Sequence, residues 1–151
     1  MANSSAIATS FKPQILSGIH ALGTTVTRGA TTADTVKAAL FLATATISAA
    51  TTVYSATGEV SGTNYSAGGV TVTNATVPTS SGTTAIWTPS ASITYTTVTL
   101  ATAFDCVLLY NSSQGDKAIM ALTFGSQTVT AATFTLSMPV NDASNALLRI
   151  A

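Results

Sequence analysis

Charged residues are scarce in this chain. Five Lys and Arg and five Asp and Glu make up 7% of its 151 residues and leave a formal net charge of zero, against about 25% charged residues in an average soluble domain. The basic residues are spread singly, so no positive stripe exists to neutralise successive phosphates, and we expect no nucleic-acid partner. Low charge also leaves little repulsion between molecules, so we expect a homo-oligomer or another association between chains.

Cysteine and histidine occur once each, as Cys106 and His20. A single cysteine forms no internal disulfide, and its place in an apolar run favours a small core residue. A single histidine has no second imidazole with which to share a metal, so we interpret His20 as a capping or packing residue. These shortages predict no metal and no cofactor.

The acidic residues stand singly, mostly beside turn residues, with no D-x-D or E-x-x-H pairing. They are Asp34, Glu59, Asp105, Asp116 and Asp142. The alternative to these turn roles is that two of the acids converge in space, as an acid/base pair or as a calcium site. A serine nucleophile would have only His20 as its base, and no G-x-S-x-G motif occurs. We therefore predict a protein that is not an enzyme and has no catalytic residues.

Long apolar runs are lacking as well. The most apolar window, "AALFLATATISAA" at 38–50, is broken by Thr and Ser and is shorter than the ~20 residues of a membrane span. The first residues, "MANSSAIATSFKPQ", contain no basic region leading into an apolar segment, as a secretory signal would. We expect no membrane partner and synthesis inside the cell.

Short β-branched and aromatic runs fill most of the chain after residue 33, separated by clusters of Gly, Pro, Asn and Ser. The expected strands begin at residues 35, 69, 84, 92, 104, 117, 133 and 146. This spacing is typical of antiparallel all-β domains. We predict a β-sandwich of jelly-roll or Ig-like type over 34–151.

The stretch "FDCVLLYNSSQGDKAIMALTF" at 104–124 holds two apolar runs around a polar turn. Apolar residues occupy both faces of each run, which is expected for strands in the middle of a covered sheet. The sequence therefore predicts a hairpin of two central strands. Its second apolar face needs a cover, from the N-terminal helix or from another protein.

A short helix is predicted near the N-terminus. Ser10 can cap it, Pro13 suits its first turn, and Gly23 would end it. An apolar stripe at intervals of four is formed by Ile7, Phe11, Ile15 and Ile19. We predict an N-terminal arm over 1–33 that binds a partner through these four residues, and we expect removal of residues 1–22 to leave a folded β domain.

Aromatic residues are few but suggest one alternative function. Aromatic faces pack on sugar rings, so a carbohydrate-binding β module would use them as a platform. The candidates are Trp87, Tyr54, Tyr65, Tyr95 and Tyr110. Most lie in or beside predicted strands, which favours a core or subunit interface.

Two long segments carry a resemblance to a known group of proteins. The matching features are "VKAALF" with "TTVYSATGEVSGTNYSAGG", then "LLYNSS", "DKAIMALTFGS" and the closing "LLRIA". They resemble small virion proteins encoded in the structural-gene regions of tailed bacteriophages, over most of the chain from residue 35. Residues 11–22 also resemble the N-terminal part of some members.

The resemblance implies a virion structural protein, made in the host cytoplasm and located in the particle. We expect a capsid decoration or cement protein that binds and stabilises the lattice of the major capsid protein, gaining avidity from many copies. A collar, tail or fibre-associated virion protein is the alternative. No catalytic residues are associated with these proteins, so the resemblance implies none here.

Overall fold

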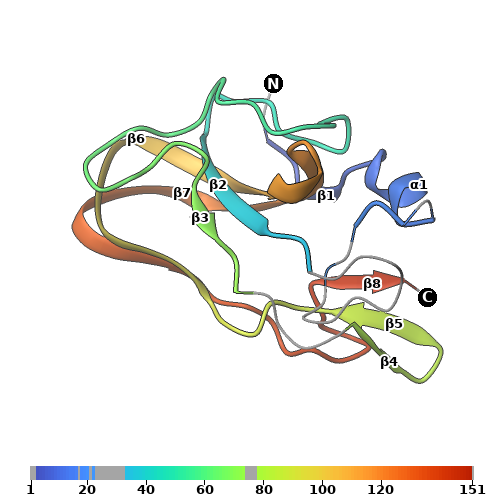
Figure 1. The fold of residues 1–151 in the computed structure, drawn as a ribbon. Helices are drawn as coiled ribbons and strands as arrows, with labels where there is room; N and C mark the ends of the chain where they lie inside the picture. The colour runs from blue at the N-terminus through green and yellow to red at the C-terminus, as the bar shows by residue number, and fades with distance from the viewer. Residues whose placement is uncertain (1–2, 17, 21, 23–32, 74–77, 151) are drawn as a thin grey trace.

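Two antiparallel β-sheets make up the described part of the chain, with one short helix beside them (Figure 1). The computed structural model describes residues 3–16, 18–20, 22, 33–73 and 78–150. The larger sheet has the strand order β1-β7-β6-β2-β3 and the smaller one β4-β5-β8. The strands are β1 (Ala6–Ile7), β2 (Val36–Leu42), β3 (Val70–Thr71), β4 (Thr79–Ser81), β5 (Thr84–Trp87), β6 (Ile93–Asn111), β7 (Lys117–Leu136) and β8 (Leu148–Ile150). The all-β prediction is confirmed, and the two sheets are consistent with a sandwich.

The predicted hairpin lies at the centre of the larger sheet. β6 and β7 pair antiparallel, with Leu109 opposite Met120. Their turn contains the 3-10 helix η1 (Ser112–Gln114), where the side chain of Asn111 accepts a hydrogen bond from the backbone N of Ser113 at 3.1 Å. Gly115 then adopts φ 66°, a left-handed conformation that glycine enters without steric cost. The prediction of a hairpin over 104–124 is confirmed.

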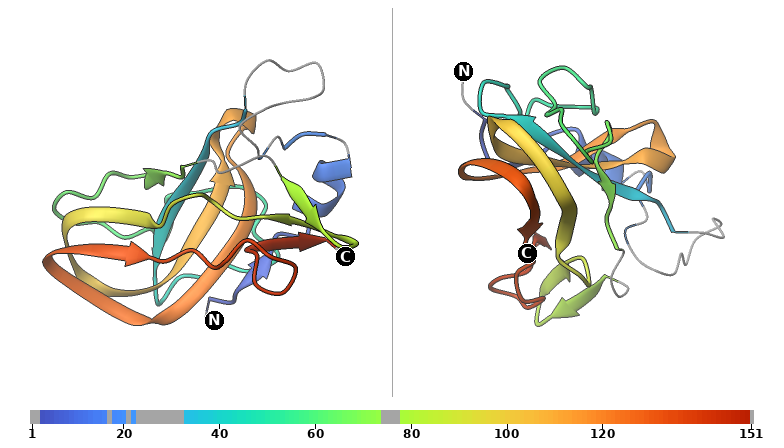
Figure 2. Two further views of the ribbon diagram at one scale, coloured as in Figure 1. Left: turned by 90° about the horizontal axis from the view of Figure 1, so that it is seen from below. Right: turned by 90° about the vertical axis from the view of Figure 1, so that its left-hand side faces the viewer.

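Both strands of this hairpin run further than predicted. β6 has 19 residues and β7 has 20, because each joins two segments that the sequence marked as separate strands. The pairing shifts register at several points between Tyr95 and Cys106, and Thr97 and Ala131 have positive φ angles of 50° and 47°. Such shifts bend a strand pair. The hairpin accordingly curves through both views of Figure 2.

The hairpin divides into two halves that differ in burial. The turn half comprises 104–111 of β6 with 117–123 of β7, and the far half comprises 93–103 with 124–136. In the turn half, 106–111 and 118–121 are buried. The ring of Tyr54 stacks on that of Tyr110 at 4.6 Å between centroids, and on the other face Asn111 contacts His20. The chain itself therefore covers both apolar faces of the turn half.

The N-terminal helix is shorter than predicted. Helix α1 (Phe11–Leu16) has six residues and follows Ser10, but the Ser10 Oγ is buried and finds no hydrogen-bond partner in the described ranges, so the expected cap is absent there. Gly18 has φ 67°, its N donates to the Ile15 carbonyl at 2.9 Å, and the N of Ile19 donates to the Gln14 carbonyl at 2.9 Å. These two bonds are the usual glycine-ended helix terminus. The helix thus stops at Gly18, before Gly23, which lies outside the described residues.

The described N-terminal residues belong to the larger sheet. β1 pairs with β7, with Ala6 opposite Ala121. The predicted boundary between an N-terminal arm and a β domain at residue 33 stays a prediction.

The smaller sheet lies beside α1, and in it Trp87 of β5 stands opposite Leu148 of β8 (Figure 1). Among the described residues, no helix is long and apolar enough to cross a membrane.

Candidate functional site

The four residues predicted to bind a partner do not form one exposed stripe. Ile7 lies in β1, opposite Met120. Phe11 is 0% exposed, and its ring centroid lies 4.7 Å from that of His20. Ile15 and Ile19 are partly buried. Phe11 is therefore a core residue whose side chain is not available at the surface, whereas a partner role for the other three stays a prediction.

Asn3 fastens the start of the chain to the larger sheet. Its Nδ2 donates to the Leu42 carbonyl at 3.0 Å and to Oδ1 of Asp105 at 2.6 Å. Its Oδ1 accepts from the backbone N of Ile47 at 2.9 Å. All the polar atoms of this amide are thus used within the molecule, and the segment before β1 is held against β2 and β6 rather than projecting as an arm.

His20 takes part in a polar network on one face of the turn half. The Nδ2 of Asn111, which is buried, donates to Nδ1 of His20 at 3.0 Å and to Oδ2 of Asp34 at 2.6 Å. Gln114 Nε2 donates to Oδ1 of Asp34 at 3.2 Å, and His20 Nε2 lies 2.9 Å from Oε1 of Gln14. The network joins α1, Asp34 two residues before β2, and the hairpin turn.

These partners fix the tautomer of His20. An amide Nδ2 only donates, so Nδ1 of His20 accepts from Asn111, and an amide oxygen only accepts, so Nε2 donates to Gln14. His20 is therefore neutral with its proton on Nε2. Burial lowers the pKa of His20, which agrees with this neutral form; nearby Asp34 acts in the opposite direction, and Lys117 adds to the lowering. The packing interpretation of His20 fits this environment.

Glu59 is the centre of a second polar cluster. Tyr54 Oη donates to its Oε2 at 2.5 Å, while Tyr65 Oη and the backbone N of Gly68 donate to its Oε1 at 2.7 and 2.8 Å. Burial raises the pKa of Tyr65, and the hydrogen bond to Glu59 raises it further. Tyr110 Oη donates to the Gly68 carbonyl at 2.8 Å. The cluster ties the loop between β2 and β3 to the sheet.

The five aromatic residues considered for a sugar platform do not share an exposed face. Trp87, Tyr95 and Tyr110 are each 2% exposed. Tyr54 and Tyr65 are partly buried and use their hydroxyl groups on Glu59. These side chains serve the core and its polar contacts, so none of the described geometry favours the carbohydrate-binding alternative.

The acidic residues are also distributed separately. Glu59 binds tyrosines, Asp34 binds Asn111, and Asp142 accepts from the backbone N of Ser144 at 2.8 Å. Within the described ranges, no three His, Cys, Asp or Glu residues come close enough together to hold a metal ion. Cys106 is buried in β6, where burial raises its pKa to about 12. A buried thiol of this kind is a poor nucleophile.

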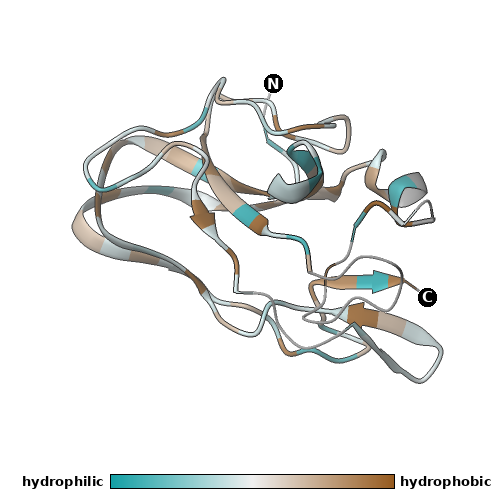
Figure 3. Ribbon diagram, in the orientation of Figure 1, coloured by the Kyte–Doolittle hydropathy of each residue, from teal (hydrophilic) through white to brown (hydrophobic). Residues whose placement is uncertain are grey.

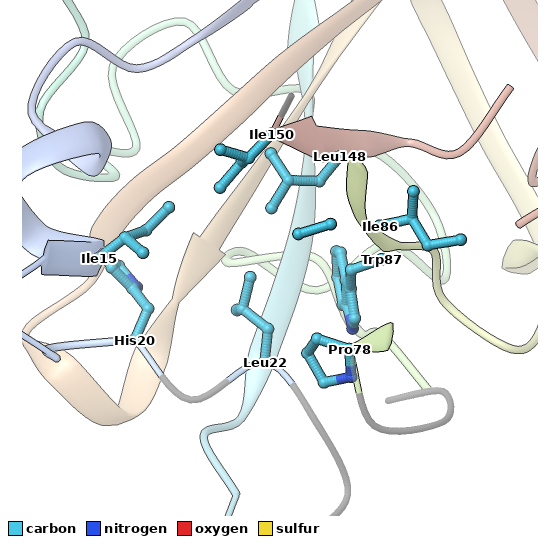
Figure 4. Close-up of a pocket in the computed structure, with 9 residues that line it drawn as sticks. Ile15, His20, Leu22, Pro78, Ile86, Trp87, Leu148 and Ile150 are labelled. Carbon is cyan, nitrogen blue, oxygen red and sulfur yellow. The ribbon is translucent and has the colours of Figure 1, made fainter. Parts of the chain in front are cut away.

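An apolar pocket of about 140 Å³ lies between the N-terminal segment and the smaller sheet (Figure 4). The N-terminal segment, β5 and β8 each supply part of its wall. The lining side chains are Ile15, His20, Leu22, Pro78, Ala85, Ile86, Trp87, Leu148 and Ile150. Ile86, Trp87 and Leu148 are buried, whereas Pro78, Ala85 and Ile150 are exposed at the rim.

Trp87, in the wall of this pocket, carries an unsatisfied polar atom. Its side chain is almost completely buried, and its Nε1 finds no hydrogen-bond partner among the described residues. Buried donors in folded proteins nearly always have a partner, from the protein or from water. The indole N–H of Trp87 is therefore an unsatisfied donor enclosed in the wall of the pocket and not open to it.

The second candidate surface is the free edge of the far half. β1 pairs with Met120 and Ala121 only, and Ser5 Oγ accepts from the backbone N of Thr123 at 2.6 Å. Beyond that point, no described strand pairs with β7 on the side away from β6. This stretch, 124–136, contains no charged residue and no proline. Figure 2 shows it along the margin of the molecule, and Figure 3 shows mostly white and pale brown colours on it, with little teal.

Neither surface was found from the sequence. The pocket is lined by residues up to 135 positions apart in the sequence, so local patterns do not predict it. The single Trp of the chain, Trp87, is the one sequence feature that pointed to this region. The sequence does not mark the free edge, because residues 125–132 lie between two predicted strands and have the composition of a connection. The absence of charge and proline across 118–136 is the signal that an uninterrupted strand was possible.

The chain matches no protein-family model, no curated protein and no solved structure in comparisons with known proteins.

Proposed function

We propose that this protein is a structural component of a tailed-bacteriophage virion, and specifically a capsid decoration protein that binds the major capsid protein and its own neighbours. The proposal starts from the resemblance of the sequence over 35–77 and 108–151 to small phage virion proteins. It assigns no catalysis, and the polar groups of His20 and Glu59 are engaged in hydrogen bonds within the fold.

The observation that carries the proposal is the free edge of β7. A long strand edge with unpaired N–H and C=O groups is a template for pairing with another chain. Single-chain proteins usually protect such an edge with Lys or Pro, and 124–136 has neither. A surface of this kind suits a protein whose working state is an assembly.

The burial pattern of the far half supports the same role. Phe124, Val129, Phe134 and Leu136 point to the partly buried face, and the rings of Phe124 and Phe134 lie 5.4 Å apart. The other face of β7 carries exposed Thr, Ser and Ala. A strand that paired with this edge would therefore continue an apolar face on one side of the sheet and a face of hydroxyl groups on the other. Because 124–136 carries no charge, salt would weaken such pairing little.

Quantifying the protein in purified particles of the phage that encodes it tests this function. We expect a fixed ratio to the major capsid protein, set by the symmetry of the lattice. A few copies per particle would instead support the collar, tail or fibre-associated alternative. Absence from purified particles would contradict a virion role altogether.

A further inference from the structure

The free edge of β7 contains one regular stretch, 132–136. Residues 134–136 pair with 93–95 of β6 without a register shift. The next shift adds its extra residue to β6, because Ala132 pairs with Val98. The shift after that adds its extra residue to β7, beside Ala131, which has φ 47°. Since a bulge bends the strand that carries it, β7 is regular from Ala132 to its end.

This stretch presents two different faces to a neighbouring strand. Phe134 and Leu136 are partly buried on one face, where the ring centroid of Phe134 lies 5.1 Å from that of Phe104. Thr133 and Thr135 are exposed on the other face. A strand that extends the sheet here needs the same alternation, with apolar residues on the first face and hydroxyl groups on the second.

A second copy of the same stretch has this alternation. When an edge strand pairs antiparallel with its own copy, a twofold axis relates the two strands, and each face continues across the contact. With the axis at Phe134, the two Phe134 rings lie opposite each other and Thr133 of each copy lies opposite Thr135 of the other. This register uses all of 132–136, whereas an axis one residue away would bring Ala131 or Ser137 into the ladder.

Charge does not oppose such a contact. Pairing a strand with its own copy brings like charges close together, which is unfavourable, but 118–141 contains no charged residue. Beyond the regular stretch, 137–140 of each copy would run beside 128–131 of the other. This segment includes Val140, whose side chain is 69% exposed. The contact would therefore give an apolar side chain that the single chain leaves in water a neighbouring strand to pack on.

We propose that two copies of this protein join by antiparallel pairing of 132–136 about a twofold axis at Phe134, so that their larger sheets become one continuous sheet. The inference rests on the proposed function, in which the protein binds its own neighbours through the free edge of β7. It adds the partner strand, the symmetry and the register of that contact.

Single cysteines at exposed positions test the register. Thr133→Cys and Thr135→Cys each place a thiol on the hydroxyl face, and this register sets thiol opposite thiol only when the two variants are mixed. Opposed Cα atoms of an antiparallel pair lie about 4.5–5.5 Å apart, which a disulfide can span. Cys106 is buried and common to all variants. Mild oxidation with diamide and non-reducing gel electrophoresis measure the linked dimer.

We expect the equal mixture to give a linked dimer, in about half of the paired molecules because partners assort at random. Each variant alone should give none. Thr96→Cys, at an exposed threonine of β6, is the matched control, and it should give no linked dimer alone or mixed with either variant.

Two results would overturn the proposal. A mixture that links no better than Thr96→Cys shows that the stretch does not pair with its own copy. Thr135→Cys that links alone moves the axis to Thr135 and contradicts the register. The copy number in particles is independent of both. A fixed ratio there without a linked dimer would leave a capsid-protein strand as the partner of the edge, and a linked dimer from a protein absent from particles would reject the virion role alone.

Discussion

Gly69 occupies a position that no other residue can take without moving the backbone. It has φ 70°, and a Cβ at this residue would overlap the carbonyl oxygen of Ala38 in β2. The next residue, Val70, begins β3 and pairs with Ala38. The close approach of the two backbones is therefore a condition for adding β3 to the larger sheet, since a side chain at Gly69 would push the strands apart.

Replacing Gly69 by alanine should destabilise the fold strongly. The left-handed φ costs about 1 kcal/mol for a residue with a Cβ, and the overlap with a backbone oxygen adds about 1–3 kcal/mol. Gly82→Ala is the matched control, because Gly82 has φ 61° with no atom within 4 Å of the added Cβ. We expect urea unfolding to show a loss for Gly69→Ala about 2 kcal/mol larger than for Gly82→Ala. Equal losses would mean that the close approach is absent.

His20 should make the stability of the protein depend on pH near neutrality. Its pKa is lowered on folding from 6.5, chiefly by burial, with Asp34 raising it and Lys117 lowering it further. Just below pH 6.5 the unfolded chain therefore binds more protons than the folded one, so the free energy of unfolding falls as the pH drops through this window. Protonation would also turn Nδ1 of His20 into a donor, so that it would face the Nδ2 of Asn111, which is a donor as well, and their hydrogen bond would be lost.

Urea midpoints at about pH 7.5 and about pH 5.5 measure this effect. His20→Gln keeps a polar side chain but cannot titrate, and since the chain has one histidine it should remove most of the difference between the two midpoints. The same drop in both proteins would show that another group titrates in this range.

Single residues of the sequence predicted that helix α1 exists better than they predicted where it begins and ends. Ser10 does precede α1, but its Oγ makes no cap within the described residues, and Gly18 ends the helix where the sequence favoured Gly23. Gly18 and Gly23 can each end a helix, and the sequence alone does not decide between them; in the structure Gly18 takes the left-handed φ that ends it. The burial of Phe11 could not be foreseen either, because an apolar stripe does not reveal what covers it.

At the level of elements, the sequence identified β2, β5 and the hairpin turn, since these are marked by apolar runs between turn residues. It missed the continuity of β6 and β7. Each register shift moves the following side chains to the other face, so the alternation that marks a strand is broken at every bulge. Residues 101–103 and 125–132, between the predicted strands, are mostly small or weakly polar and carry no strong signal for either strand or turn.

The free edge of β7 leads to a prediction about association. Thr128 is exposed in 124–136, so Thr128→Lys places a charge where a neighbouring strand would pair. We expect the unmodified protein to self-associate with rising concentration in analytical ultracentrifugation. The variant should associate at least about tenfold more weakly, which is about 1.4 kcal/mol.

Thr96→Lys is the control for charge and residue type. Thr96 is exposed on β6 in the same half of the hairpin, but β6 is contacted on its other side, where Thr99 N donates to the Thr63 carbonyl at 3.1 Å. This variant should associate like the unmodified protein. Equal weakening by the two lysines would show that added charge, and not the edge, is responsible, while a monomer at all concentrations would remove the self-pairing role.

At the scale of the whole molecule, the N-terminal residues contribute to the stability of the larger sheet. With a net charge of zero, the fold depends on apolar burial and hydrogen bonds that reach from one end of the chain to the other. Asn3 contacts Asp105, β1 pairs with β7, and Phe11 lies in the core of the described residues. The first 22 residues are thus part of the stability of the sheet and not only a means of attachment.

Removal of residues 1–22 should therefore destabilise the β domain, contrary to what the sequence predicts. Deleting a buried Phe side chain costs about 3–5 kcal/mol, and the truncation also removes β1 and the contacts of Asn3, which leaves more of the β7 edge unpaired. Phe11→Ala tests the core contribution alone, and Ile19→Ala, at a partly exposed residue, is its control. We expect chemical unfolding to rank stability as unmodified protein, Ile19→Ala, Phe11→Ala and truncated chain, in falling order. The loss of a fully buried ring from a shared core must lower the free energy of unfolding. A truncated chain as stable as the full one would therefore show that the N-terminal segment is an independent arm.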